Sequence, residues 1–477
     1  MSLRITAVYL LVAVLSVYAW KDWFKSLCGL ILMMAVMEHE DMPKAMFGIQ
    51  GLNLWNVLFV VICLAWIASR SREGLTWDMP RRIMVLLLMY LGVIVVGVSW
   101  AIFDRSHIES YPLKSLISEE LINTIKWTLP GVLLFDGCRT RRRVLLALIC
   151  LFAMYSVITV QVVRRMPPSS VFSSSGAIDD TRTVCQDIGY NACDMSTMLA
   201  GVSWAVLAAL PLVHRRKYRL MMLATAGMFA YGQALTGGRA GYLAWGATGL
   251  ALGLLKWRKY VILAPVVVLL LPVVLPGATA RMLEGFGRTD VAGQKITDDY
   301  RVTAGRTQIW PHVIDKISES PLIGHGRLAM ERTGLTEFCG QTYGQSEAFP
   351  HPHNMYLETL LDNGIVGSLP IFLFWGTMIL YSARLFVSTN RLYSAVGGLA
   401  LALMLAQLVG GIGAQHFYPR ESTMCMWAAM FLSLRLYVEE MRVRMDTIVA
   451  ESPSEGQLLQ PEAAVAFANA GGTAARW

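Results

Sequence analysis

The sequence predicts an all-α protein that crosses a membrane many times. Of its 477 residues, 55% are hydrophobic and only 16% are charged, and the mean hydropathy is +0.49. Such a chain lacks the polar surface that a soluble protein of this length needs. Apolar stretches long enough to cross a hydrocarbon core recur almost from end to end, so we expect about 12–13 transmembrane helices.

Each expected span is an apolar run bounded by polar or turn-forming residues. The thirteen segments are 3–20, 26–38, 53–69, 83–103, 119–136, 144–163, 195–213, 219–236, 240–255, 259–275, 365–386, 394–413 and 423–438. The segment 26–38 is short, so the first two segments could instead form a broken pair that does not fully cross. The side of the N-terminus depends on this choice.

Short clusters of basic residues between the spans all fall on one side of the membrane. The clusters are Lys21 and Lys25; Arg70, Arg72, Arg81 and Arg82; Arg139, Arg141, Arg142 and Arg143; Arg215, Arg216, Lys217 and Arg219; Lys256, Arg258 and Lys259; Arg384 and Arg391. Because cytoplasmic loops are rich in Lys and Arg, this side is predicted to be the cytoplasm of a bacterial inner membrane protein. The net charge of +8 is explained by these clusters, and nucleic acid is not an expected partner.

The opposite, outer side receives one long polar segment. We divide the chain into spans with short outer loops (1–275), a large periplasmic loop (276–364), the last spans (365–440) and a disordered cytoplasmic tail (441–477). Within the loop, an amphipathic stretch is expected to form a helix lying on the membrane domain. Its apolar positions are Ile309, Val313, Ile314 and Ile317, and Pro321 and Gly324 bound it.

The cysteines do not suggest a metal site, because no CxxC or Cys/His spacing is present. Most lie in or beside apolar segments, where a small buried side chain is expected. Cys185 and Cys193 lie in an outer segment, and a disulfide between them is expected if that compartment is oxidising.

The segment HPHNMYLETLLDNGIVG, residues 351–367, predicts a short helix that begins just after two histidines. Asn354 is a good N-cap, and Asn363 with Gly364 supplies a stop. The positive end of a helix disfavours a protonated imidazole, so His353 is expected to be neutral and able to accept a proton. The alternative is that His351 and His353 only cap a turn.

Two arginines on the outer side are candidates for binding phosphate. Arg239 lies in LTGGRAGYLAW (235–245), where glycines allow the backbone to approach a ligand closely, and Arg306 opens GRTQIWPHVIDKISESPLIGHG (305–326). Alternatively, Arg239 extends to lipid headgroups, and Arg306 pairs with a loop carboxylate. Further candidates for lining the site are Arg182, Arg301, His325, His351, Asn354 and Arg420.

Arginines together with a neutral base suit the transfer of a sugar from a diphosphate carrier. The arginines would hold the diphosphate leaving group while His353 takes the proton from an acceptor hydroxyl. This is an inverting glycosyl transfer in which arginine charge replaces a divalent metal, so neither a metal nor a cofactor is expected.

Three motifs resemble the O-antigen ligase and O-antigen polymerase superfamily of bacterial membrane glycosyltransferases. They are TGGRAG, GRTQIW…SPLIGHG and HN…LLDNGIVG, and with the long outer loop they cover roughly residues 190–440 in the family's order. The resemblance implies a GT-C-like fold and an undecaprenyl-diphosphate-linked glycan as donor. It also implies that Arg239 and Arg306 bind the diphosphate and that His353 is the catalytic base.

The acceptor stays open between a glycan, lipid A-core and a protein. A ligase would add the finished glycan to another molecule, as in lipopolysaccharide biosynthesis, whereas a polymerase would join repeat units of O-antigen or exopolysaccharide. A glycolipid flippase is a more distant alternative. The family often has Ser before the first arginine where Gly238 stands here, and its Asn-Pro-Asn-like segment is only loosely matched by YNACDMSTMLA.

Overall fold

A computed structural model describes residues 3–46, 48–172, 184–283, 305–343, 349–415 and 417–451, and it is almost entirely helical. The first half contains α1 (Leu3–Ala19), α2 (Trp23–Met37), α3 (Leu54–Arg70), α4 (Arg81–Phe103), α5 (Leu113–Ser115), η1 (Leu116–Asn123), α6 (Thr124–Lys126), α7 (Leu129–Gly137), α8 (Arg141–Arg165), α9 (Ser169–Phe172), α11 (Ala192–Ala209), η2 (Leu210–Leu212) and α12 (Arg216–Leu235). A small antiparallel hairpin joins β1 (Ala45–Met46) and β2 (Ile49–Gln50).

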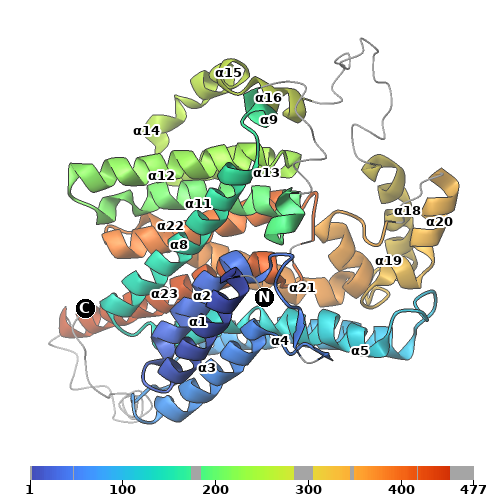
Figure 1. Cartoon of the computed structure of the whole chain (residues 1–477), viewed down its shortest axis with the longest axis horizontal. Helices are drawn as coiled ribbons and strands as arrows, with labels where there is room; N and C mark the ends of the chain where they lie inside the picture. Colours follow the sequence, from blue (N-terminus) through green and yellow to red (C-terminus); the bar gives the residue numbers. More distant parts are fainter. Residues whose placement is uncertain are drawn as a thin grey trace.

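The second half of the chain continues with α13 (Arg239–Leu255), α14 (Arg258–Val261), α15 (Ala264–Val274), α16 (Pro276–Met282), α18 (Arg306–Glu319), α19 (Ala329–Arg332), α20 (Leu335–Tyr343), α21 (Met355–Val387), α22 (Arg391–Gly410), η3 (Glu421–Thr423) and α23 (Met424–Glu451). The centre of the bundle is α22, which packs against α11, α13, α21 and α23. Helices α18, α19 and α20 form a separate cluster beside the bundle, at the right of Figure 1. The predicted all-α, polytopic membrane fold is confirmed.

The helices agree closely with the predicted spans, although fewer satisfy a strict test of length and hydropathy. Five do so: α4, α8, α11 with η2, α21 and α22; the bent pair α15 and α16 would make a sixth. Helices α1, α2 and α3 are apolar but shorter. The predicted span 119–136 is divided into η1, α6 and α7, and α23 continues to Glu451, so the start of the predicted tail is helical.

All six basic clusters meet at one end of the bundle, which we call the basic end. Asp78 contacts Arg139 and Arg435 at 2.8 Å each, joining the segments beside α4, α8 and α23. Other contacts at this end are Arg143–Glu73, Trp23–Glu73, Lys256–Ser394, Arg391–His214, Ser388–Glu440 and Arg444–Glu440. The prediction that these clusters share one side therefore holds.

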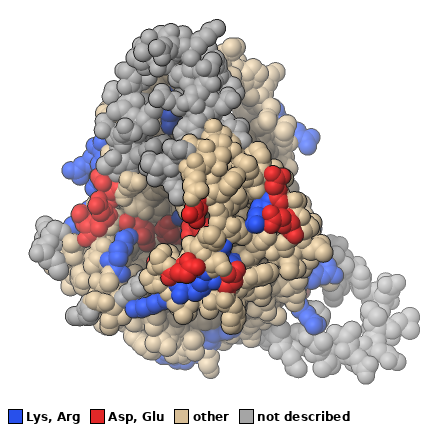
Figure 2. Space-filling model, turned by 90° about the vertical axis from the view of Figure 1, so that its right-hand side faces the viewer, with Lys and Arg blue, Asp and Glu red and all other residues tan. Residues whose placement is uncertain are grey.

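The segments between the spans that lack basic clusters meet at the opposite end, which we call the site end. They are 38–52, 104–118, 164–194, 237–239, 276–364 and 414–422, and the contacts below join their described residues. Asp104 pairs with Arg332 at 2.5 Å, and Arg420 contacts Asp194 at 3.8 Å. Further links are Glu40–Asp187, Arg281–Gly237 and Gln415–Glu358. Acidic and basic side chains intermix on the face seen in Figure 2. The two ends are thus distinct in composition, and the candidate residues lie at the second.

Candidate active site

The turn that carries the two histidines is held by three different elements. As predicted, the side chain of Asn354 caps α21, accepting from the backbone N–H groups of Tyr356 and Leu357. The carbonyl of Pro352 accepts a hydrogen bond from the indole of Trp310 at 2.9 Å, and the Met355 N–H donates to the carbonyl of Gly411 at 2.8 Å. These bonds keep His353 in a left-handed conformation (φ 50°), which is uncommon for a non-glycine residue.

Both histidines are neutral at pH 7 because the site disfavours positive charge. Burial, with the nearby His351 and Arg306, lowers the pKa of His353 to about 3. Burial and Arg420 lower the pKa of His351 to about 4. His351 Nδ1 accepts from the backbone N–H of His353 at 3.2 Å, whereas no described residue hydrogen-bonds to either ring nitrogen of His353. The His353 ring is therefore available to a ligand.

Arg306 is a half-buried cation with an incomplete set of partners. It is the first residue of α18, and its guanidinium donates to the carbonyl of Gly413 at 3.2 Å. Its Nε is buried and has no hydrogen-bond partner, and no carboxylate among the described residues forms an ion pair with it. Burial lowers the pKa of this guanidinium below its usual value. Such a cation costs free energy unless an anion accompanies it.

The turn that carries Arg239 faces Arg306 across Gly413. Arg239 begins α13, after a turn in which Gly237 has a positive φ of 65°. A Cβ added at Gly413 would lie 3.1 Å from the Arg306 guanidinium and 3.4 Å from the Cβ of Ala240. The structure thus brings together two motifs whose arginines are 67 positions apart in the chain.

Four helices begin around Arg306, and their amino ends carry partial positive charge. Two are α13 and α18 themselves. The third is α21, which begins just after His353, and the fourth is α11, whose first turn contains Cys193 close enough to raise the pKa of Arg306. Exposed N–H groups and aligned dipoles at helix starts form anion sites, so this arrangement suits a phosphate or diphosphate.

Close packing against α11 explains why Gly238 stands where the family often has serine. A Cβ at this position would lie 2.7 Å from the Cβ of Ser196 on α11, and a Cβ at Gly241 would lie 1.9 Å from the Ser196 hydroxyl. That hydroxyl instead donates to the carbonyl of Gly238 at 3.1 Å. A serine at 238 would therefore clash, and the serine hydroxyl is supplied by the neighbouring helix.

A network of ion pairs beside the histidines was not predicted. Arg327 is buried and bonds to Glu120 (2.8 Å), Glu358 (2.8 Å) and Asp362 (2.9 Å). The carboxylates Glu358 and Asp362 are four residues apart on α21, a spacing that places them on one face and that the sequence displays. Their common partner, Arg327, lies in the GHGR turn. Local sequence spacing does not predict that it contacts them.

The remaining candidates have different surroundings. His325 donates from Nε2 to the Lys316 carbonyl at 2.9 Å, so its ring fastens the end of α18. Arg420 forms ion pairs with Asp194 and with Glu421 at 3.7 Å, and its charge lowers the pKa of His351. Arg182 and Arg301 lie outside the described residues.

Among the described residues, the cysteines form no disulfide, so the expected Cys185–Cys193 bond is not seen. Nor, in the same part of the chain, do three His, Cys, Asp or Glu side chains group closely enough to hold a metal ion.

Comparison with known proteins agrees with the motifs. Residues 223–372 match the Wzy_C family, described as O-antigen ligase, and this stretch contains Arg239, Arg306 and His353. No curated protein matches the chain. The family indicates a membrane glycosyltransferase that acts with lipid-linked glycans and their acceptors. The predicted resemblance to the O-antigen ligase superfamily is confirmed for residues 223–372, the stretch that the family model matches.

Proposed function

We propose that the protein is an inverting, metal-independent glycosyltransferase that moves a glycan from undecaprenyl diphosphate to an acceptor hydroxyl at the periplasmic face. One observation carries the proposal. A half-buried arginine, Arg306, has no carboxylate partner among the described residues and lies beside a neutral histidine, His353, where four helices begin. In this arrangement, Arg306 and the helix starts can bind an anionic leaving group, and His353 can accept a proton.

In the proposed reaction, His353 accepts the proton of the acceptor hydroxyl as its oxygen attacks the anomeric carbon. The bond from that carbon to the diphosphate oxygen breaks, and the undecaprenyl diphosphate leaves with the bonding electron pair. Arg306 and Arg239 stabilise the negative charge that develops on the leaving group. Attack from the side opposite the leaving group inverts the anomeric configuration.

The low pKa of His353 fits this reaction once the donor has bound. A base with a pKa of about 3 is neutral at pH 7 but weak. A diphosphate beside it would introduce negative charge and partly neutralise Arg306, and both effects favour the protonated imidazole. The base therefore strengthens when the donor is present.

The acceptor decides between two forms of the reaction. As a ligase, which we favour, the protein would transfer the glycan to lipid A-core or another separate acceptor. As a polymerase, it would use a second lipid-linked glycan. We place both at the periplasmic face because the basic end matches the composition of cytoplasmic loops and the site lies at the other end.

The test is product formation by the purified full-length protein in detergent, with lipid-linked oligosaccharide and EDTA. Wild type is compared with His353→Ala and Arg306→Ala. The matched controls are His107→Ala, at an exposed histidine of the site end, and Lys316→Ala, at a partly exposed lysine of α18. We expect both site variants to lose transfer by about 10²–10⁴-fold and both controls to retain it.

Product composition then separates the alternatives. Longer lipid-linked glycans in the absence of another acceptor indicate a polymerase, whereas products that require lipid A-core or another acceptor indicate a ligase. Full activity in folded His353→Ala would contradict the assigned base. Loss of wild-type activity in EDTA with recovery on adding Mg²⁺ would contradict the metal-independent mechanism.

A further inference from the structure

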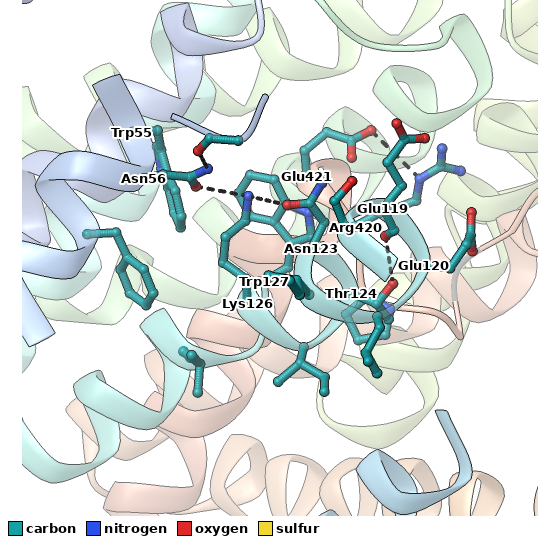
Figure 3. Close-up of a pocket in the computed structure, with 18 of the residues that line it drawn as sticks. Trp55, Asn56, Glu119, Glu120, Asn123, Thr124, Lys126, Trp127, Arg420 and Glu421 are labelled. Carbon is teal, nitrogen blue, oxygen red and sulfur yellow. Dashed lines mark hydrogen bonds and ion pairs between the residues drawn. The ribbon is translucent and has the colours of Figure 1, made fainter. Parts of the chain in front are cut away.

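A large cavity lies beside the candidate active site, on the side away from α13. It measures about 1130 Å³ and is enclosed by α3, the segment from η1 to α7, and residues 415–421. Figure 3 shows its interior, with Lys126 and Asn123 between Trp55 and Asn56 on one side and Glu119 and Glu120 on the other. Its size suits several sugar units rather than one small molecule.

The cavity shares its wall with the active site. Arg327 and Arg420 line it, and the charges of both lower the pKa of His351. Gln415 also lines it and donates to Glu358 at 2.9 Å, four residues from the histidine turn. The diphosphate arginines approach from α13 and α18, so a molecule in this cavity would reach His353 from another direction than the donor.

Most charged side chains of the cavity have a partner of opposite charge. Lys44 pairs with Glu38 at 2.9 Å. Arg327 pairs with Glu120, and Arg420 with Glu421, as described above. The carboxylate of Glu119 accepts from the hydroxyl of Tyr111 at 2.9 Å and is exposed at the rim, where water weakens its field.

Lys126 is the exception among the described residues that line the cavity. Its ammonium donates to two neutral amide oxygens, of Asn123 at 2.8 Å and of Asn56 at 3.1 Å, and forms no ion pair. It also lies 4.1 Å from the ring centre of Trp127 and 5.0 Å from that of Trp55. Both rings are buried, so they hold the cation in place without neutralising it.

An ammonium group has three N–H donors, and the two amides use two of them. The remaining donor, and a charge that no described carboxylate contacts directly, suit an anionic acceptor group that enters from the cavity. Amides and carboxylates elsewhere on the wall suit the hydroxyl groups of sugars. Together these features describe a binding site for an acidic glycan.

We propose that this cavity binds the acceptor glycan and that Lys126 recognises an anionic group on it, either a uronic acid carboxylate or a sugar phosphate. This inference rests on the proposed function, because the transfer reaction is what makes a second glycan necessary. Lys126 is then a specificity-determining residue and not a catalytic one.

The test measures binding without any transfer reaction. Three trisaccharides share a lactose core and end in glucuronic acid, glucose 6-phosphate or glucose. Their dissociation constants are measured by calorimetry with the full-length protein in detergent at low ionic strength. We expect wild type to bind at least one acidic trisaccharide about tenfold more tightly than the neutral one, because the contact is a charge-assisted hydrogen bond. Added salt should reduce this preference.

Three variants locate the preference. Lys126→Gln should bind the acidic and neutral trisaccharides equally, whereas Lys126→Arg should keep the preference. Lys114→Gln, at an exposed lysine of α5 outside the cavity, is the matched control and should behave as wild type. If Lys126→Gln does not fold, the affinities of wild type and Lys126→Arg for the acidic and neutral trisaccharides still test the proposal.

Equal affinity of wild type for all three trisaccharides would overturn the inference, as would an undiminished preference in folded Lys126→Gln. A preference for the carboxylate alone or the phosphate alone identifies the anionic group and supports the proposal. Acid-selective binding without any glycan transfer would contradict the proposed function only. Transfer by His353 without acid selectivity would contradict this inference only.

Discussion

Two arginines at the site end, the buried Arg327 and the half-buried Arg306, have opposite surroundings. Arg327 bonds to three carboxylates and lies 3.7 Å from the ring centre of Tyr418, so its charge is fully compensated. Arg306 bonds to one carbonyl, and its Nε has no partner in the described structure. The first arginine completes a network that fixes the outer helices to the bundle. The second is left with unused binding capacity, which is characteristic of a ligand site.

The largest expected effect comes from removing the compensated arginine. Arg327→Met would leave Glu120, Glu358 and Asp362 without their cation, and breaking a buried ion-pair network costs about 3–5 kcal/mol. We expect a marked loss of thermal stability in detergent. Lys316→Met, at a partly exposed residue of α18, should change stability by no more than about 0.5 kcal/mol. A stable Arg327→Met protein would contradict the contrast between the two arginines.

Arg306→Met should give the reverse pattern. Removing a half-buried cation that has no counter-ion in the described part of the chain should leave stability unchanged or raise it, because its desolvation cost disappears. Glycan transfer should nevertheless fall by about 10²–10³-fold, as when a charge-stabilising donor is removed from an active site. Thermal unfolding and transfer rates of the same preparation check both parts. A large loss of stability would instead assign Arg306 to the packing of α18.

A smaller loss of stability is expected at the contact between α11 and the start of α13. Gly238→Ser restores the residue common in the family but brings a Cβ to 2.7 Å from that of Ser196. Overpacking of this kind costs about 1–3 kcal/mol, and Ser196→Gly in the same chain should recover most of it. Gly246→Ser is the control on the same helix, since nothing lies within 4 Å of a Cβ there. Unfolding of wild type, Gly238→Ser, Ser196→Gly and the double variant measures the coupling.

The smallest effect is a change in pH dependence. Transfer needs neutral His353, so activity falls as pH decreases through its pKa, which is about 3 in the free enzyme. The acid limb of kcat/KM should therefore lie well below pH 6, and that of kcat should lie higher because the bound diphosphate raises this pKa. Removing the charge of Arg306 should move the kcat/KM limb to higher pH. A limb near 6.5 in both profiles would contradict the burial of His353.

The elements of this fold are visible in the sequence because each depends on local residues. Apolar runs and basic clusters locate the helices and their shared end, and Asn354 marks the start of α21. Two predictions failed where packing overrides the local pattern. The segment 119–136 is divided because η1 and α6 line the cavity, and Ile314, expected on the apolar face of α18, is exposed.

The site was predictable only in part for a similar reason. Arg239, Arg306 and His353 stand in recognisable motifs, and their convergence follows from topology. In the network of Arg327, the arginine and Glu120 are 207 positions apart. Sequence spacing does not predict a contact between residues so far apart. The role of Lys126 depends on Asn56, which is 70 positions away.

Helix α18 carries both Arg306 and Trp310, which are one turn apart. Arg306 reaches the carbonyl of Gly413, and Trp310 holds the histidine turn through Pro352. A displacement of this one helix would therefore move the leaving-group ligand and the base by correlated amounts. In the proposed mechanism, the positions of the two groups therefore depend on the placement of a single helix.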